Sequence, residues 1–150
     1  MSVPTWRRKE NRKYNTLTKA IELAAHTIQC CENERIFPKR HRLSITADII
    51  KEAKDIVKVI NRANGRDLFE QYDERLMLQN QALDLLNDLE MDLNIAFATL
   101  HPNITENKID SWCKLIDETR TLLKNTIKAN FEKHKQELEE MELSTEKDNS

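Results

Sequence analysis

Residues 46–63 read TADIIKEAKDIVKVINRA, and this stretch decides the fold class. Its apolar residues recur every three or four positions, which is the period of one face of an α-helix. The members of that face are Ile49, Ala53, Ile56, Ile60 and Ala63. The dipeptide Asn64-Gly65 directly after it is typical of a turn or a helix C-cap. The stretch therefore predicts an amphipathic helix with one buried face.

The composition of the whole chain points the same way. The chain has 150 residues with one Gly and three Pro, and 33% of its residues are charged while 5% are aromatic. Average proteins contain roughly 7% Gly and 5% Pro, and sheets and barrels need many tight turns. Because Gly65 is the only glycine, glycine-rich phosphate-binding loops are excluded. The composition favours long helices and no sheet.

Three further segments have the same helical period. They cover residues 14–32, 66–100 and 105–140. The apolar pattern of the second of these is weakest around Gln79 and Asn80, where we expect a polar layer or a partner contact. Helix-breaking residues lie between the segments, namely Pro38, Gly65 and Pro102.

Short connections force neighbouring helices to run antiparallel, so the sequence predicts an all-α fold, an antiparallel up-down-up-down four-helix bundle. We expect a single bundle domain over residues 1–140, with a basic N-terminal arm. Residues 141–150 are acidic and show no apolar period, and they are predicted to form a disordered tail.

Cysteine usage and hydropathy bear on the compartment. The three cysteines are Cys30, Cys31 and Cys113, and an odd number with two adjacent residues does not suit a disulfide framework. This favours a reducing compartment. The N-terminus lacks the apolar stretch of a signal peptide, and no apolar run is long enough to span a membrane. We therefore expect a cytoplasmic protein with no membrane segment.

Catalytic and metal-binding patterns are nearly absent. Di-iron bundles use Glu-x-x-His motifs, and none of the four histidines has Glu three positions before it. His26, Cys30 and Glu34 share a helical face and would make a crude metal triad; the alternative is a core cysteine beside a surface histidine. Cys113 has no evident base to activate it. We predict no enzyme activity, no metal site and no cofactor.

The charge is distributed unevenly along the chain. Residues 1–42 hold ten basic residues against four acidic ones, a balance of +6, while residues 137–150 have a balance of −5. Such a basic end is typical of a polyanion-binding surface, and the alternative is a well-solvated surface. Trp6 and Tyr14 would stack on bases or pack on the end of the bundle. The candidate nucleic-acid contacts are Arg7, Arg8, Lys9, Arg12, Lys13, Lys39, Arg40 and Arg42.

Several short motifs carry a resemblance to a known family. They are Met1-Ser2-Val3-Pro4, Arg7-Arg8-Lys9-Glu10, Asn33-Glu34, Phe37-Pro38-Lys39-Arg40 with Arg42, Ala63-Asn64 and Ser111-Trp112. In this order the chain resembles the Avd-like proteins, the accessory variability determinants of diversity-generating retroelements. The wider superfamily includes the four-helix-bundle proteins encoded in ribosomal RNA intervening sequences.

The resemblance implies a fold, an assembly and partners. It implies an antiparallel four-helix bundle that assembles into a homo-oligomeric ring, a pentamer. It further implies binding to RNA or DNA and to a reverse transcriptase, so that template RNA is copied into cDNA for mutagenic retrohoming. The family's basic positions fall on Arg7, Arg8, Lys39, Arg40 and Arg42. The acidic C-terminus departs from the family, and we expect it to compete with phosphate for the basic residues of its own chain.

A second function class remains open on the residues themselves. The near-zero net charge of −2 and the long fourth segment also suit a helical protein-interaction scaffold that binds no nucleic acid. Apolar residues outside the main face predict a homo-oligomer in either case, because exposed apolar patches usually mark interfaces. Those residues are Leu78, Leu85, Met91 and Ile95.

Overall fold

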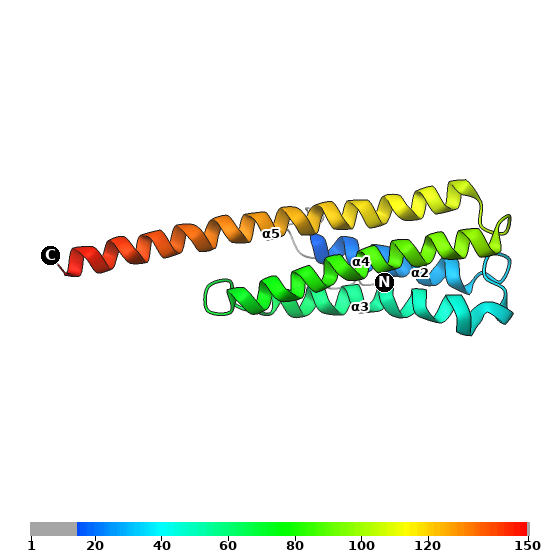
Figure 1. Ribbon diagram of the computed structural model, residues 1–150, viewed down its shortest axis with the longest axis horizontal. Coiled ribbons are helices and arrows are strands. Elements are labelled where there is room, and N and C mark those ends of the chain that lie inside the picture. The colour runs from blue at the N-terminus through cyan, green and yellow to red at the C-terminus, as the bar shows by residue number, and fades with distance from the viewer. Residues whose placement is uncertain (1–14, 150) are drawn as a thin grey trace, which may run out of the picture.

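The computed structural model describes residues 15–149 of the chain. This part contains four α-helices and no strand, which confirms the all-α prediction. The helices are α2 (Thr16–Glu32), α3 (Ala47–Asn64), α4 (Tyr72–Leu100) and α5 (Glu106–Asp148), shown in Figure 1. A 3-10 turn, η1 (Lys39–His41), and a π-helical turn, η2 (Arg42–Thr46), lie between α2 and α3.

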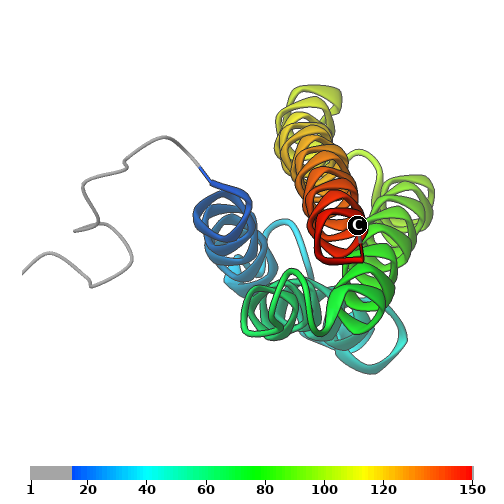
Figure 2. The same cartoon turned by 90° about the vertical axis from the view of Figure 1, so that its left-hand side faces the viewer.

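Each helix packs against two others. α3 contacts both α2 and α4, and α5 contacts the same two helices from the other side. In the end-on view, α2 lies diagonally opposite α4, and α3 lies opposite α5 (Figure 2). Figure 1 shows the α2–α3 and α4–α5 connections at one end of the molecule and the α3–α4 connection toward the other side, where α5 extends beyond it. A single core runs between the four helices.

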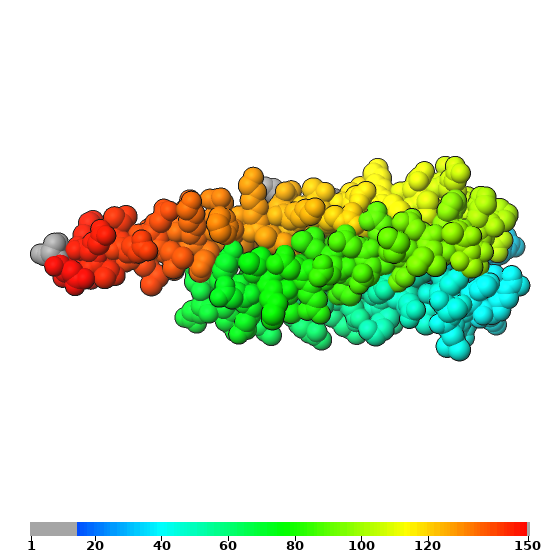
Figure 3. Space-filling model, viewed as in Figure 1, coloured from blue at the N-terminus to red at the C-terminus, as the bar shows by residue number. Residues whose placement is uncertain are grey.

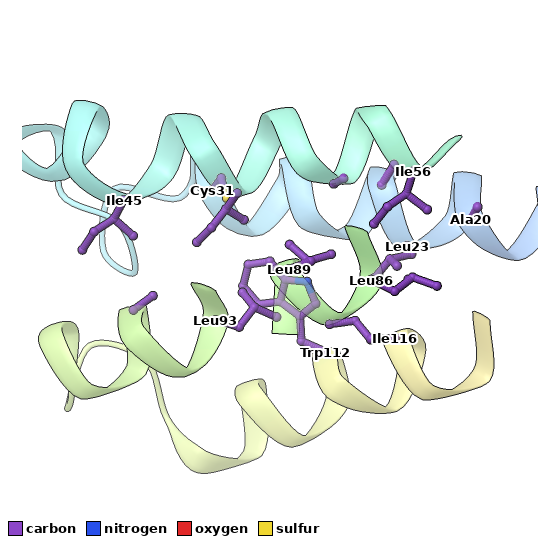
Figure 4. Packing of buried hydrophobic residues seen from close by; sticks show 14 of the residues in the cluster. Ala20, Leu23, Cys31, Ile45, Ile56, Leu86, Leu89, Leu93, Trp112 and Ile116 are labelled. Carbon is purple, nitrogen blue, oxygen red and sulfur yellow. The ribbon is translucent and has the colours of Figure 1, made fainter. Parts of the chain in front are cut away.

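The core confirms the predicted apolar face of α3 and shifts that of α2. The helical period predicts a buried face of α2 made of Leu17, Ile21, Ala24, Ile28 and Cys31, and of these Ala24 and Cys31 are buried. Every residue predicted for the buried face of α3 is buried. On α2 the buried face is centred on Leu23 and Thr27, while Ile21 and Ile28 lie half-buried at its edge. Thr27 is buried because its hydroxyl accepts a hydrogen bond of 3.0 Å from the indole Nε1 of Trp112. Figure 4 shows Trp112 between Leu93 and Ile116.

α4 begins six residues later than the sequence predicts, whereas α5 begins within one residue of its predicted start. Residues 66–71 form a turn ahead of α4, because the Asp67 carboxylate accepts hydrogen bonds from the backbone N–H groups of Phe69 and Glu70. This local bonding competes with helix formation, as short acidic side chains commonly do. At the start of α5 the N-cap is Thr105, whose hydroxyl accepts from the N–H of Lys108.

The C-terminal part of α5 differs from the expected disordered tail. The helix continues through residue 140 and reaches Asp148. No Gly or Pro follows Pro102, and the Thr145 hydroxyl donates to the Met141 carbonyl, so nothing in the sequence ends the helix earlier. Beyond Asn130 most of α5 is exposed, Phe131 included, and Figure 3 shows its end projecting past the other helices. No helix in the described part is long and apolar enough to cross a membrane.

Candidate nucleic-acid interface

The segment between α2 and α3, residues 33–46, forms a corner that is anchored in the core. Asn33 ends α2, and its carbonyl accepts hydrogen bonds from the N–H groups of Ile36 and Phe37 at 3.0 and 2.9 Å. Both side chains are then buried, and the Phe37 ring meets the edge of Trp112 with centroids 6.0 Å apart. Because two apolar residues hold this turn in the core, the basic residues that follow project outward.

Three of the predicted contact residues lie in this corner segment. Lys39 and Arg40 are in η1 and Arg42 opens η2, and all three side chains are exposed. Lys39 pairs with Glu34 at 3.3 Å, and the Arg40 Nε is 3.2 Å from the Nε2 of His41. Exposed ion pairs contribute little to stability, so these cations remain available to an anionic ligand.

A cavity of about 600 Å³ opens beside the corner segment and is called the corner cavity below. Half of its lining is uncharged and includes Phe37, Pro38 and Ile50. Four cationic residues and two carboxylates complete the lining. They are Lys39, Arg42, Lys51 and Lys54, with Glu32 and Glu34. The cavity therefore has a net positive lining that also contains apolar surface.

The four cations differ in how far they are neutralised. Lys51 bonds to Asp55 at 2.8 Å, which raises the pKa of the lysine and lowers that of the carboxyl. Arg42 and Lys54 make no ion pair with any other residue in the described range 15–149. These two side chains are the strongest candidates for direct contact with a phosphate group.

The structure brings some predicted site residues together and adds two lysines, Lys51 and Lys54, to the site. Lys39 and Arg42 line the corner cavity, and Arg40 lies between them in sequence without lining it. Sequence reasoning assigns Lys51 and Lys54 to an ordinary solvated helix face. Their spacing of three places them on one side of α3, roughly two and a half to three and a half turns after Arg42 at 3.6 residues per turn. The sequence shows that shared side, but only the fold places it beside the corner segment. The remaining predicted contacts lie outside the described residues: Arg7, Arg8, Lys9, Arg12 and Lys13.

The possible metal triad does not assemble. The Sγ of Cys30 lies 3.5 Å from the Nε2 of His26, but Glu34 follows the end of α2 and pairs with Lys39. No group of three or more His, Cys, Asp or Glu side chains within the described residues is arranged to hold a metal ion. Burial is the main cause that lowers the pKa of His26, followed by the charge of Lys108.

The cysteines lack the environment of a nucleophile. Burial raises the pKa of the Cys31 thiol to about 12, and it also raises the pKa values of Cys30 and Cys113. A reactive cysteine needs the opposite shift, since the thiolate is the attacking species. All three are free thiols.

Carboxylates gather where α3 meets α4. The Glu52 carboxyl faces that of Asp92, with Asp88 and Asp48 close enough to add repulsion. The Glu52 Oε2 atom is buried and accepts no hydrogen bond from any described residue. Burial first, and then the neighbouring carboxyl of Asp92, raises the pKa of Glu52 to about 8. The protonated form of Glu52 is therefore favoured in the folded protein.

Comparison with known proteins gives no relative: no family model, no curated protein and no solved structure matches the chain.

Proposed function

We propose that this chain is a non-catalytic accessory protein that binds the sugar–phosphate backbone of nucleic acid at the corner cavity. The observation that carries the proposal is the lining of that cavity, where four cationic side chains outnumber two carboxylates. Clustered Arg and Lys side chains bind phosphates and release the counterions condensed on the nucleic acid. Such contacts position the backbone and read no sequence, so we expect binding with little base preference.

The resemblance to the Avd-like proteins extends this proposal to partners. We propose a reverse transcriptase as the protein partner, with template RNA or cDNA as the nucleic acid. Lys39, Arg40 and Arg42 are the family's basic positions within the described residues, and they lie at the corner. Arg7 and Arg8 of the N-terminal arm complete the set. In this role the chain positions RNA and polymerase and performs no chemistry of its own.

For the architecture we infer an antiparallel up-down-up-down bundle that assembles into a homo-oligomeric ring. The packing of each helix against two neighbours supports the bundle. Of the four apolar residues that predict assembly, Leu78 and Leu85 pack at the edge of the core. Met91 and Ile95 remain 60% and 51% exposed on α4, and they are the stronger support for a contact between copies.

The test is a titration of labelled structured RNA at about 50 mM and about 200 mM salt. We expect the double variant R42A/K54A to weaken binding equally for unrelated sequences and to lower the salt slope by about one for each phosphate that is no longer bound. The matched control is K124A/K128A, which removes the same charge from exposed positions of α5. The control should bind like the wild type apart from a small decrease due to net charge.

Two results would overturn the proposal. Equal weakening in both double variants would mean that net charge alone drives binding. Absence of binding by the wild-type protein at the lower salt concentration would favour the protein scaffold. The exposed apolar residues Leu138, Met141 and Leu143 on α5 are the observation in favour of that second function.

A further inference from the structure

An arginine and a ring stack connect the turn before α4 and the start of α4 to α5. The Arg75 Nε donates to the Asn130 Oδ1 at 2.7 Å, and its Nη1 lies 3.0 Å from the Arg66 carbonyl. Beside these bonds the rings of Tyr72 and His134 stack with their centroids 4.0 Å apart. The turn before α4 is therefore fixed against α5.

A groove of about 450 Å³, called the terminal groove below, lies between this turn and α5. Its apolar lining consists of Phe69, Leu138 and Met141, which are 41%, 48% and 60% exposed. Its remaining lining is His134 and three acidic residues, with no Lys or Arg. The acidic residues are Asp67, Glu70 and Glu137.

The carboxylates of the terminal groove have no cationic partner in its lining. Backbone N–H groups of Glu70 and Phe69 bond to the Asp67 carboxylate and lower its pKa. None of the three carboxylates has an ion pair with another residue in the described part of the chain. Only Asp67 also feels a nearby cation, the Arg75 guanidinium, which lies outside the lining. The groove thus presents apolar contact area bordered by negative charge, which fits a basic segment that carries an apolar anchor.

We propose that the N-terminal arm of the same chain, residues 1–14, binds in the terminal groove. The arm reads MSVPTWRRKENRKY, so it holds an aromatic anchor, Trp6, directly before a run of cations. Among its charged side chains only Glu10 is acidic. The groove supplies apolar surface for the indole ring of Trp6 and carboxylates for Arg7 and Arg8.

The position of α2 puts the groove within reach of the arm. The arm joins α2 next to Thr16, whose hydroxyl lies 3.0 Å from that of Thr126 on α5. Leu138 lies about 18 Å farther along α5, at ~1.5 Å of rise per residue. An extended chain from Asn15 back to Trp6 spans up to about 30 Å, at ~3.3 Å per residue. The segment between Trp6 and Asn15 is therefore long enough for Trp6 to reach the terminal groove. It is also short enough to keep Trp6 near that groove.

This contact changes the expected role of the acidic C-terminus. The sequence predicts that it competes for the basic residues of its own chain, including the corner. The corner and the end of α5 lie at opposite ends of the molecule (Figure 1), so α5 does not reach the corner of its own chain. The arm is the basic segment that it does reach. The proposal goes beyond nucleic-acid binding, because docking of the arm needs no RNA.

A zero-length carbodiimide cross-link tests the contact directly in the full-length protein. The reagent joins a lysine amine to a carboxylate only when the two touch. We expect links from Lys9 or Lys13 to Asp67, Glu70 or Glu137, and we expect high salt to abolish them. Mixing chains labelled with light and heavy nitrogen separates links within one chain from links between chains. Links found only between chains, or no link to these carboxylates at low salt, would overturn docking within one chain.

A pair of charge variants tests the same contact without a reagent. E70K/E137K reverses two charges of the terminal groove, and E132K/E139K reverses two exposed charges on α5 outside it. The readout is the indole N–H signal of Trp6 in nitrogen-correlated NMR, with Trp112 as the internal reference for folding. We expect the Trp6 signal to move to the position of an unstructured indole in E70K/E137K and to stay in place in the control. A Trp6 signal that is already at that position in the wild type, or that moves equally in both variants, would overturn the proposal.

Discussion

Replacing Glu52 with Gln should stabilise the protein in a pH-dependent way. Burial, Asp92, Asp88 and Asp48 all oppose the charged form of Glu52 and raise its pKa in the folded protein. Glutamine has nearly the shape of a protonated glutamate, and its amide donates a hydrogen bond without needing that proton. The variant should therefore match the wild type at low pH and become relatively more stable as the pH rises.

The size of the effect follows from the two pKa values. The pKa of Glu52 is about 8 in the folded protein and near its ordinary value of 4.5 in the unfolded chain. Folding takes up a proton between these values, so the contribution to stability is lost as the pH rises from about 4.5 to about 8. The full difference sets a ceiling of about 5 kcal/mol. Because Glu52 is only partly buried, solvent screening reduces the expectation to about 1–2 kcal/mol.

Urea unfolding followed by circular dichroism at a series of pH values measures this difference. The quantity of interest is the free energy of unfolding of E52Q minus that of the wild type, which cancels the titration of other carboxyls. We expect it to be near zero at about pH 5 and to rise by about 1–2 kcal/mol by about pH 9. E139Q, at an exposed position on α5, is the control and should give a flat line. A flat line for E52Q as well would refute the raised pKa of Glu52.

Three further variants and measurements test other contacts. T27V should lower the free energy of unfolding by about 1–3 kcal/mol in urea, because it leaves the buried Trp112 Nε1 without its acceptor; A25V, at an exposed position of the same helix, should cost less. R75L should speed amide hydrogen exchange in residues 65–71 while leaving the exchange of α2 unchanged, since it removes the bonds that fix that turn against α5; unchanged exchange in the turn would contradict this. Cys31 should react with a thiol reagent much more slowly in the folded protein than in urea, because burial disfavours its thiolate; equal rates in both conditions would contradict this.

The sequence predicts the helices well because each has a strong apolar period and few breakers. The face of α3 is a case in point, since every residue assigned to it is buried. The centre of the α2 face could not be predicted, because burial of Thr27 depends on a hydrogen bond to Trp112 from a distant part of the chain. The start of α4 differs from the prediction for a local reason, because the Asp67 carboxylate accepts hydrogen bonds from the N–H groups of Phe69 and Glu70.

The candidate site likewise has one part that the sequence predicts and another that only the fold brings together. Lys39, Arg40 and Arg42 stand in a nearly contiguous run, so their grouping is visible in the sequence. Lys51 and Lys54 join the corner cavity only because α3 folds back beside the corner segment, which is a tertiary fact. The terminal groove cannot be seen in the sequence for the same reason, since its lining comes from two segments separated by the whole of α4.

The anchoring of the corner explains why its cations can act together. A flexible loop would lose conformational freedom on binding, at a cost of roughly 1–2 kcal/mol for each residue ordered. Here Ile36 and Phe37 are buried, and the Phe37 ring contacts Trp112, so this turn is already fixed before a ligand arrives. Arg42 follows in a hydrogen-bonded turn, with its own N–H bonded to the Lys39 carbonyl. Only the long cationic side chains remain to be ordered, which favours binding of a backbone whose phosphates are evenly spaced.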